Sequence, residues 1–175
     1  MAATARKTRT KAKETKERLT LDGLAAMSPA QLARVYAAGT VPGSLAELNG
    51  DREGRMLAVR GAGKGFVARR LAQLAKSKLF PWEGKRFTSK KSAKTGKGVN
   101  RVKIAGRLFP FETTIRKSPR DGRLAIALNY DLPANPAPIR RIYDELREVA
   151  PGVFLGPSLW KTAKGYQLLL WFAVA

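Results

Sequence analysis

LFPFETTIRKSPRDGRLAIALNY, residues 108–130, has the pattern of a β-hairpin. Two runs of aromatic, β-branched and aliphatic residues, Leu108–Arg116 and Leu124–Tyr130, flank the segment Lys117–Gly122. That segment contains Ser-Pro-Arg-Asp-Gly, and both proline and glycine favour a reversal of the chain. The stretch therefore predicts two neighbouring antiparallel strands joined by a short turn.

Similar short runs lie on both sides of this hairpin and are separated by Gly, Pro and Asn. We expect further strands at Gly84–Thr88, Asn100–Ile104, Val153–Trp160 and Tyr166–Val174. Short strands with turn residues between them are typical of an antiparallel sheet or barrel. The stretch Ser89–Val99 is rich in Lys, Ser and Gly, so we expect a mobile loop there.

Apolar residues at helical spacing predict several helices. In Pro138–Val149 the apolar positions are Ile139, Ile142, Leu146 and Val149, which indicates an amphipathic helix that covers one face or end of the sheet. Nearer the N-terminus, Ser28-Pro29-Ala30-Gln31 is a capping-box pattern that begins a helix ending at Gly39. A short helix at Ser44–Leu48 and a longer one at Gly65–Lys78 complete the expected set.

These patterns predict an α+β protein, with an antiparallel, barrel-like sheet, a helical N-terminal portion and one inserted amphipathic helix. Residues 1–18 hold seven basic and two acidic residues and no large apolar side chain after Met1, so we expect a disordered basic arm. Residues 19–175 are expected to form a single globular domain. Its helical portion is 19–79 and its β-rich portion is 80–175.

The charge of the chain is its most unusual global property. The 34 Lys and Arg against 13 Asp and Glu give a formal net charge of +21 at pH 7. A charge of this size attracts polyanions and anionic lipid, so the expected partner is an anionic membrane surface or nucleic acid. No stretch approaches about 18 consecutive apolar residues, so we expect a cytoplasmic protein, with peripheral contact to the membrane as one option.

Histidine and cysteine are both absent from the sequence. Their absence excludes zinc fingers and catalysis by Ser-His or Cys-His pairs. The acidic residues in or near the helix expected at Pro138–Val149 are Asp131, Asp144, Glu145 and Glu148. Asp144, Glu145 and Glu148 fit the solvated face of that helix better than a catalytic pair. We therefore expect no catalytic residues, no metal site and no cofactor, and favour a binding protein over an enzyme.

Several motifs in the second half of the chain resemble a known family. Trp82–Phe87 reads Trp-x-Gly-Lys-x-Phe, and it is followed by Tyr130-Asp131, Pro138-Ile139, Asp144–Val149 and Leu155-Gly156. In these motifs the chain resembles a small bacterial family of unknown function that is associated with Gly-x-Trp-x-Gly-motif domains. The resemblance extends from Trp82 to the C-terminus, and it implies a lipocalin-like (calycin-like) barrel. The Gly-x-Trp-x-Gly element itself is absent upstream.

A lipocalin-like barrel encloses a small ligand where its interior side chains leave room. The first functional hypothesis is therefore binding of a hydrophobic or anionic lipid-like ligand, while the basic segments contact an anionic surface. The candidate ligand-binding residues are aromatic: Trp82, Phe87, Phe109, Phe111, Tyr130, Trp160, Tyr166 and Trp171. Aromatic residues that alternate along strands also form ordinary core, which is the alternative interpretation of this set.

The rival hypothesis is nucleic-acid binding without sequence specificity. It uses the basic arm and the segment Lys76–Arg107, with Trp82 or Phe87 as a stacking face. The candidate polyanion-binding residues are Lys85, Arg86, Lys90, Lys91, Lys94, Lys97, Arg101, Lys103 and Arg107. An interior cavity lined by the aromatic residues would favour the first hypothesis. A filled core with aromatic residues exposed among Lys and Arg would favour the second.

Overall fold

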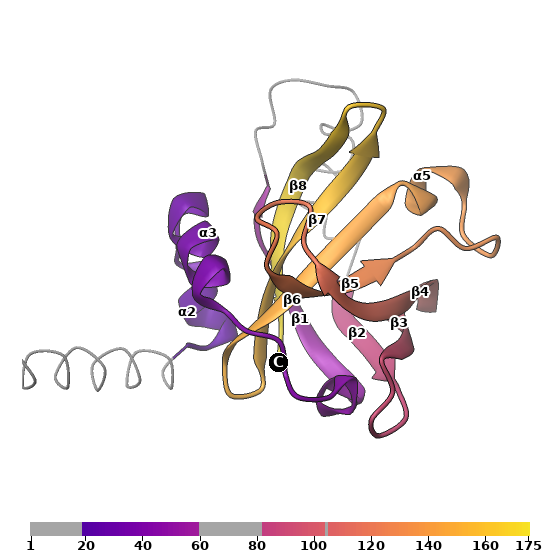
Figure 1. Ribbon diagram of the computed structural model, residues 1–175, viewed down its shortest axis with the longest axis horizontal. Coiled ribbons are helices and arrows are strands. Elements are labelled where there is room, and N and C mark those ends of the chain that lie inside the picture. The colour runs from indigo at the N-terminus through magenta and orange to yellow at the C-terminus, as the bar shows by residue number, and fades with distance from the viewer. Residues whose placement is uncertain (1–18, 60–81, 104) are drawn as a thin grey trace, which may run out of the picture.

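Eight antiparallel strands form a closed barrel in the computed structural model, which describes residues 19–59, 82–103 and 105–175 (Figure 1). Each strand pairs with the next along the chain, and the last pairs with the first. The strands are β1 (Gly50–Val59), β2 (Trp82–Thr88), β3 (Thr95–Val102), β4 (Gly106–Lys117), β5 (Leu124–Asn129), β6 (Ile142–Ala150), β7 (Val153–Thr162) and β8 (Gly165–Val174). The expected barrel-like sheet is confirmed.

The hairpin that the sequence predicts at residues 108–130 is present as β4 and β5. Ile115 pairs with Ile126, and the turn between the strands is closed by hydrogen bonds from Ser118 N to Arg123 O and from Gly122 N to Ser118 O. Gly122 has a φ of 71°, a left-handed conformation that favours glycine. The local turn chemistry and the tertiary pairing therefore agree.

The strand β1 lies within residues 19–79, which the sequence assigns to a helical portion. Its inward positions include Gly50, Arg52 and Gly54, so a run of apolar side chains at every second residue is missing. Arg52 donates hydrogen bonds to the backbone oxygens of Leu48 and Glu47 at the end of the preceding helix. The strand is held by pairing with β2 and β8, which a local sequence pattern does not reveal.

The prediction of an amphipathic helix at Pro138–Val149 is wrong. Only α5 (Ala137–Arg140) is helical, and Ile142–Ala150 forms β6. The apolar residues of β6 divide between two cores, since Leu146 packs inside the barrel and Val149 packs outside it against the N-terminal helices. Burial on both faces removes the period-two alternation that identifies a strand from sequence.

The mobile loop expected at Ser89–Val99 is shorter than predicted, because β3 already begins at Thr95. Glycine is required at Gly98 by close packing. A Cβ atom there would lie 2.4 Å from the ring of Phe111. Gly96 and Gly98, which suggest a loop in the sequence, are thus strand residues, and Gly98 lies beside a large interior side chain.

Two helices pack against the outside of the barrel (Figure 1). They are α2 (Leu21–Ala25) and α3 (Pro29–Ala38), and α3 begins with the predicted capping box between Ser28 and Gln31. The predicted helix after Ser44 is the short 3-10 helix η1 (Leu45–Leu48). The basic arm 1–18 and the helix Gly65–Lys78 lie outside the described residues.

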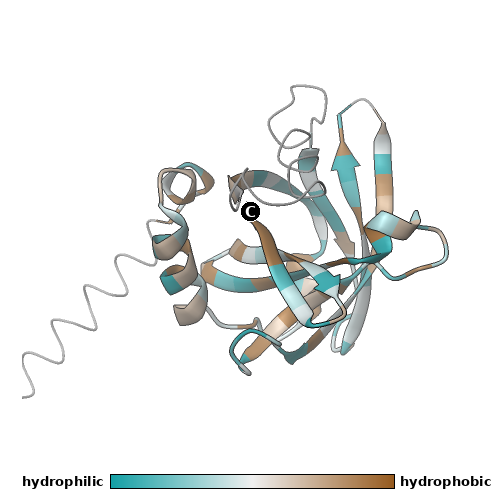
Figure 2. Ribbon diagram, turned by 90° about the horizontal axis from the view of Figure 1, so that it is seen from above, coloured by the Kyte–Doolittle hydropathy of each residue, from teal (hydrophilic) through white to brown (hydrophobic). Residues whose placement is uncertain are grey.

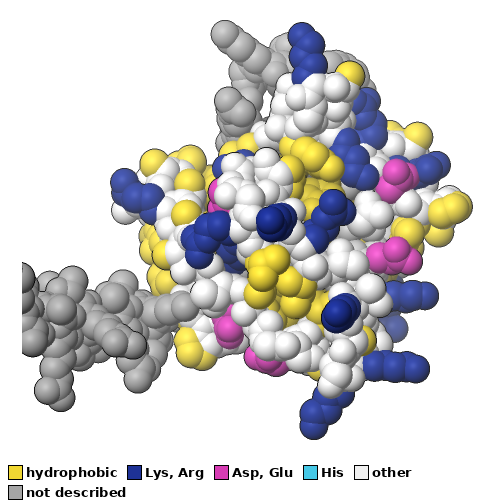
Figure 3. All heavy atoms as spheres, viewed as in Figure 1, with side chains coloured by type: hydrophobic (Ala, Val, Ile, Leu, Met, Phe, Trp, Pro, Cys, Tyr) yellow, Lys and Arg dark blue, Asp and Glu magenta, His cyan; other side chains and the backbone are white. Residues whose placement is uncertain are grey.

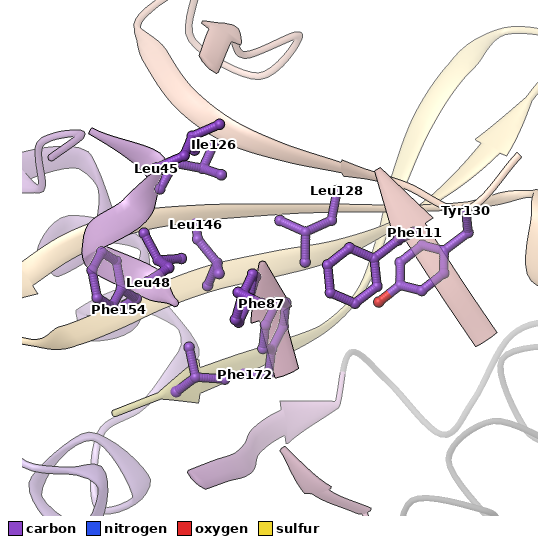
Figure 4. Packing of buried hydrophobic residues seen from close by; sticks show 11 residues of the cluster. Leu45, Leu48, Phe87, Phe111, Ile126, Leu128, Tyr130, Leu146, Phe154 and Phe172 are labelled. Atoms are coloured by element: carbon purple, nitrogen blue, oxygen red, sulfur yellow. The ribbon is translucent and has the colours of Figure 1, made fainter. Parts of the chain in front are cut away.

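The barrel interior and the helix-covered outer wall form separate cores. The interior core includes Leu45 and Leu48 from η1 together with Phe87, Phe111 and Leu146 from the strands (Figure 4). The outer core joins α2 and α3 to β6, β7 and β8 through residues such as Leu32 and Trp171. Hydrophobic and hydrophilic bands alternate along several strands, as expected for barrel walls (Figure 2).

Candidate ligand-binding site

A cavity of about 230 Å³ lies within the barrel beside the interior core. Its wall is mostly apolar, and four aromatic side chains contribute to it. The lining residues are Met56, Trp82, Lys85, Asn100, Phe109, Tyr130, Ile139, Ile142, Asp144, Ser158, Leu169, Leu170 and Phe172. Ligand pockets are characteristically apolar with a few placed polar groups, which is the composition of this wall.

A lysine and an aspartate form an ion pair on this apolar wall. Lys85 Nζ lies 3.1 Å from Asp144 Oδ2, and their side chains are 4% and 5% exposed. Lys85 comes from β2 and Asp144 from β6, so barrel closure brings together residues 59 positions apart. Burying both charges is costly unless they are paired and hydrogen-bonded, and here they are.

Two neutral side chains complete the hydrogen bonds of this pair. Lys85 Nζ also donates to Asn100 Oδ1 at 2.8 Å and to the hydroxyl of Tyr130 at 2.5 Å. The Tyr130 hydroxyl donates to Asp144 Oδ2 at 3.0 Å. We call Lys85, Asn100, Tyr130 and Asp144 the polar cluster.

The orientation of Asn100 is fixed by its other partners. Its Oδ1 accepts from Trp82 Nε1 at 3.0 Å, and its Nδ2 donates to Phe109 O at 3.2 Å and to the Tyr130 hydroxyl at 3.3 Å. Phe109 has a φ of 57°, an uncommon conformation for a residue other than glycine. In this conformation the backbone oxygen of Phe109 accepts a hydrogen bond from Asn100, a residue of the polar cluster.

Burial shifts the pKa values of two residues of the polar cluster, Lys85 and Tyr130. Desolvation lowers the pKa of Lys85 from its usual value, and the charge and hydrogen bond of Asp144 oppose this effect. Desolvation also raises the pKa of Tyr130 well above its usual value, and the nearby Asp144 charge raises it further. The aromatic rings of Trp82 and Phe172 lie 5.4 and 5.0 Å from Lys85 Nζ, so they help to stabilise its positive charge.

The structure brings some of the eight aromatic candidates to the cavity and others elsewhere. Trp82, Phe109 and Tyr130 line it, while Phe87 and Phe111 belong to the adjoining interior core. Figure 4 shows Phe111 and Tyr130 next to each other, with ring centres 5.2 Å apart. The other three candidates are not among the lining residues.

Those three residues serve other contacts. Trp171 is buried in the outer core, where its ring meets Tyr36 edge-on at 5.5 Å. Tyr166 is 44% exposed and packs on Tyr143. The Trp160 ring lies beneath the guanidinium of Arg141 at 4.7 Å.

Sequence reasoning missed the polar half of the site. The predicted polyanion-binding role of Lys85 is wrong, because the residue is 3% exposed. The predicted place of Asp144 on a solvated helix face is also wrong, because the residue lies inside the barrel at 4% exposure. A usable signal was the alternation in β2, where Lys85 stands one residue after Gly84 and two before the inward-facing Phe87.

The remaining polyanion candidates lie on the outside of the barrel. Arg86 forms an ion pair with Asp51, and Arg101 forms ion pairs with Asp51 and Glu83. The other six candidates are exposed to solvent: Lys90, Lys91, Lys94, Lys97, Lys103 and Arg107. Figure 3 shows Lys and Arg projecting around one face of the molecule, with few acidic side chains between them.

Comparisons with known proteins add little to this geometry. No family model matches the chain, and no curated protein matches it. The crystal structure of a protein from Thermomonospora curvata is similar, with 18% sequence identity and a TM-score of 0.48. The similarity covers 85% of this chain and 87% of that chain. Among the described helices, none is sufficiently long and apolar to span a membrane.

Proposed function

We propose that this protein binds one small, mainly hydrophobic molecule inside its barrel. The observation that supports this function is the interior cavity with an apolar wall and a single polar cluster. A β-barrel is compatible with a binding protein, and side chains leave space in this one. The motifs between Trp82 and Leu155-Gly156 resemble those of a family for which a lipocalin-like barrel is expected, and such a barrel can enclose a small ligand.

The size of the cavity limits the ligand. Pockets for drug-sized ligands usually have volumes of about 300–1,000 Å³, and this cavity is smaller at about 230 Å³. A compact molecule or a medium-length alkyl chain is therefore the proposed ligand. A long-chain lipid would need space beyond this cavity.

Native mass spectrometry of protein purified in high salt tests the proposal. We expect a small-molecule adduct, or uptake of an added apolar compound such as nonane. Leu170→Trp places a large side chain in the cavity wall and should abolish the adduct. The matched control is Leu124→Trp, at a position on β5 that is 52% exposed, and it should retain the adduct. The absence of any small-molecule binding by the folded wild-type protein would refute the proposal.

The same experiment addresses nucleic-acid binding. The exposed lysines of the β2–β3 turn support an electrostatic contact with a polyanion, since their charges face solvent. The stacking face expected from Trp82 or Phe87 does not support it, because Phe87 is 4% exposed and Trp82 lines the cavity. Co-purified oligonucleotide with an empty barrel would favour this alternative.

A further inference from the structure

We infer that the cavity selects a neutral ligand carrying a hydrogen-bond donor, such as a hydroxyl or an amide N–H, which binds Asp144 Oδ1. This inference rests on the proposed function and adds the polar chemistry of the ligand. Of the two ligand classes considered, hydrophobic and anionic lipid-like, it favours a neutral hydrophobic molecule over an anionic one. The preference for such a ligand follows from which hydrogen-bonding positions in the polar cluster are already occupied.

The donors of the polar cluster are fully used. The three protons of the Lys85 ammonium have three acceptors, in Asn100, Tyr130 and Asp144. The Tyr130 hydroxyl proton goes to Asp144 Oδ2, and both protons of Asn100 Nδ2 have oxygen partners. A ligand that needs a donor from this cluster, such as a carboxylate, would have to break an existing hydrogen bond.

The acceptors are used as well, with one exception. Asn100 Oδ1 and the Tyr130 oxygen each accept two hydrogen bonds, and so does Asp144 Oδ2. Asp144 Oδ1 is buried and has no hydrogen-bond partner among the described residues. Buried carboxylate oxygens are nearly always hydrogen-bonded, and Asp144 is one of the residues that line the cavity, so we assign the missing partner of this oxygen to a group of the ligand.

Electrostatics favour a neutral donor over a charged one. Lys85 and Asp144 neutralise each other, so a ligand charge of either sign would enter an apolar site without a counter-ion of its own. A ligand ammonium would face Lys85, and a ligand carboxylate would face Asp144. A hydroxyl avoids both penalties and gains a hydrogen bond to a charged acceptor, which is stronger than one between neutral groups.

Ser158 lies next to Asp144 in the sheet. It pairs with Asp144 across β6 and β7, and both residues line the cavity. Directly opposite residues of an antiparallel pair face the same side of the sheet. A ligand hydroxyl that donates to Asp144 therefore has a second hydroxyl on the same wall as a partner.

Four probes of similar size test whether the cavity prefers a neutral donor, a neutral acceptor, a purely apolar molecule or an anion. They are octanol, its isomer methyl heptyl ether, nonane and octanoate. Only octanol carries a neutral donor. Binding is followed by tryptophan fluorescence, to which Trp82 on the cavity wall contributes. We expect octanol to bind about tenfold or more tightly than the ether or octanoate, the effect expected for one hydrogen bond to a charged group.

Asp144→Asn should reduce the preference for octanol over the ether, because a hydroxyl and an ether oxygen can both accept a hydrogen bond from the new amide. Lys85 and Tyr130 both donate to one oxygen of Asp144, so the amide oxygen of the variant takes that place. Its NH₂ group then replaces the free oxygen Oδ1. The ether should consequently gain on octanol in this variant, while Asp131→Asn, an exposed carboxylate outside the cavity, should keep the wild-type order.

The outcomes distinguish the inference from the function on which it rests. Equal affinity for octanol, ether and nonane, or tightest binding of octanoate, would overturn the donor requirement and leave cavity binding intact. Failure of all four probes to bind folded wild-type protein would refute the proposed function itself. The wild-type series is decisive even where Asp144→Asn does not fold.

Discussion

Arg147 is a fully buried charged residue of the outer wall, with an exposed fraction of 0%. Its guanidinium binds both carboxylate oxygens of Asp121 at 2.7 Å and donates to the backbone oxygens of Leu124 and Arg123. It also lies 4.2 Å from the ring of Tyr36 on α3. Beside it, buried Glu145 accepts hydrogen bonds from Tyr36 and Ser118. This arrangement fixes α3 and the β4–β5 turn to β6.

Arg147→Met should therefore destabilise the fold strongly. Removing one partner from a buried charged network typically costs about 3–5 kcal/mol. In this network Glu145 would stay buried without the neighbouring positive charge, while Asp121 is 30% exposed and can be solvated. Urea unfolding followed by circular dichroism gives the change in free energy. Arg34→Met, on an exposed position of α3, is the matched control and should change stability by about 0.5 kcal/mol or less. Similar effects at the two positions would show that the network is not stabilising.

At the scale of elements, β6 carries the main disagreement between sequence and structure. Its inward residues supply Asp144 to the cavity and Leu146 to the interior core. Its outward residues supply Glu145 and Arg147 to the contact with α3. Asp144 and Glu148, one helical turn apart, suggest a solvated helix face. In the strand, Asp144 lies inside the barrel instead, and Glu145 and Arg147 lie under α3. Local spacing alone could not distinguish these two arrangements.

Leu146→Ala should cost about 2–5 kcal/mol of unfolding free energy, since it removes a fully buried side chain and leaves a cavity. The matched control is Leu124→Ala on β5, where the side chain is 52% exposed and the expected change is below about 1 kcal/mol. Thermal and urea unfolding measure both variants. Equal costs would contradict the placement of Leu146 in the interior core.

At the scale of the whole molecule, burial of tyrosines couples stability to alkaline pH. Desolvation raises the pKa of Tyr143 to about 12 and raises the pKa values of Tyr36 and Tyr130 further. These groups stay protonated in the folded protein above about pH 10, where unfolded tyrosines ionise. Lys85 acts in the opposite sense, because its lowered pKa makes folding more favourable as pH rises towards 10.5.

Stability should consequently fall as pH rises above about 10.5, where Lys85 is neutral in both states and the buried tyrosines keep their protons only in the folded state. Each such tyrosine contributes a slope of up to about 1.4 kcal/mol per pH unit. Urea unfolding across this range, together with tyrosinate absorbance, measures the effect. Tyr143→Phe should reduce the slope, and a slope unchanged by that substitution would exclude Tyr143 as a contributor.

The sequence by itself determined the features that depend on neighbouring residues. The hairpin at residues 108–130, the capped start of α3 at Ser28 and the strands from Val153 onward follow from turn chemistry and local periodicity. The sequence also indicated an antiparallel barrel and placed Trp82, Phe109 and Tyr130 among the candidate ligand contacts. Each of these inferences uses information within one or two elements.

Only the tertiary structure decided what lies on each side of the barrel wall. Lys85 and Asp144 meet because β2 and β6 face each other across a closed sheet, and no local pattern records that distance. Trp171 and Arg147 are buried because helices cover the outside of their strands. Barrel closure and helix packing are long-range events, so they determine which side chains form the cavity and which hold the wall together.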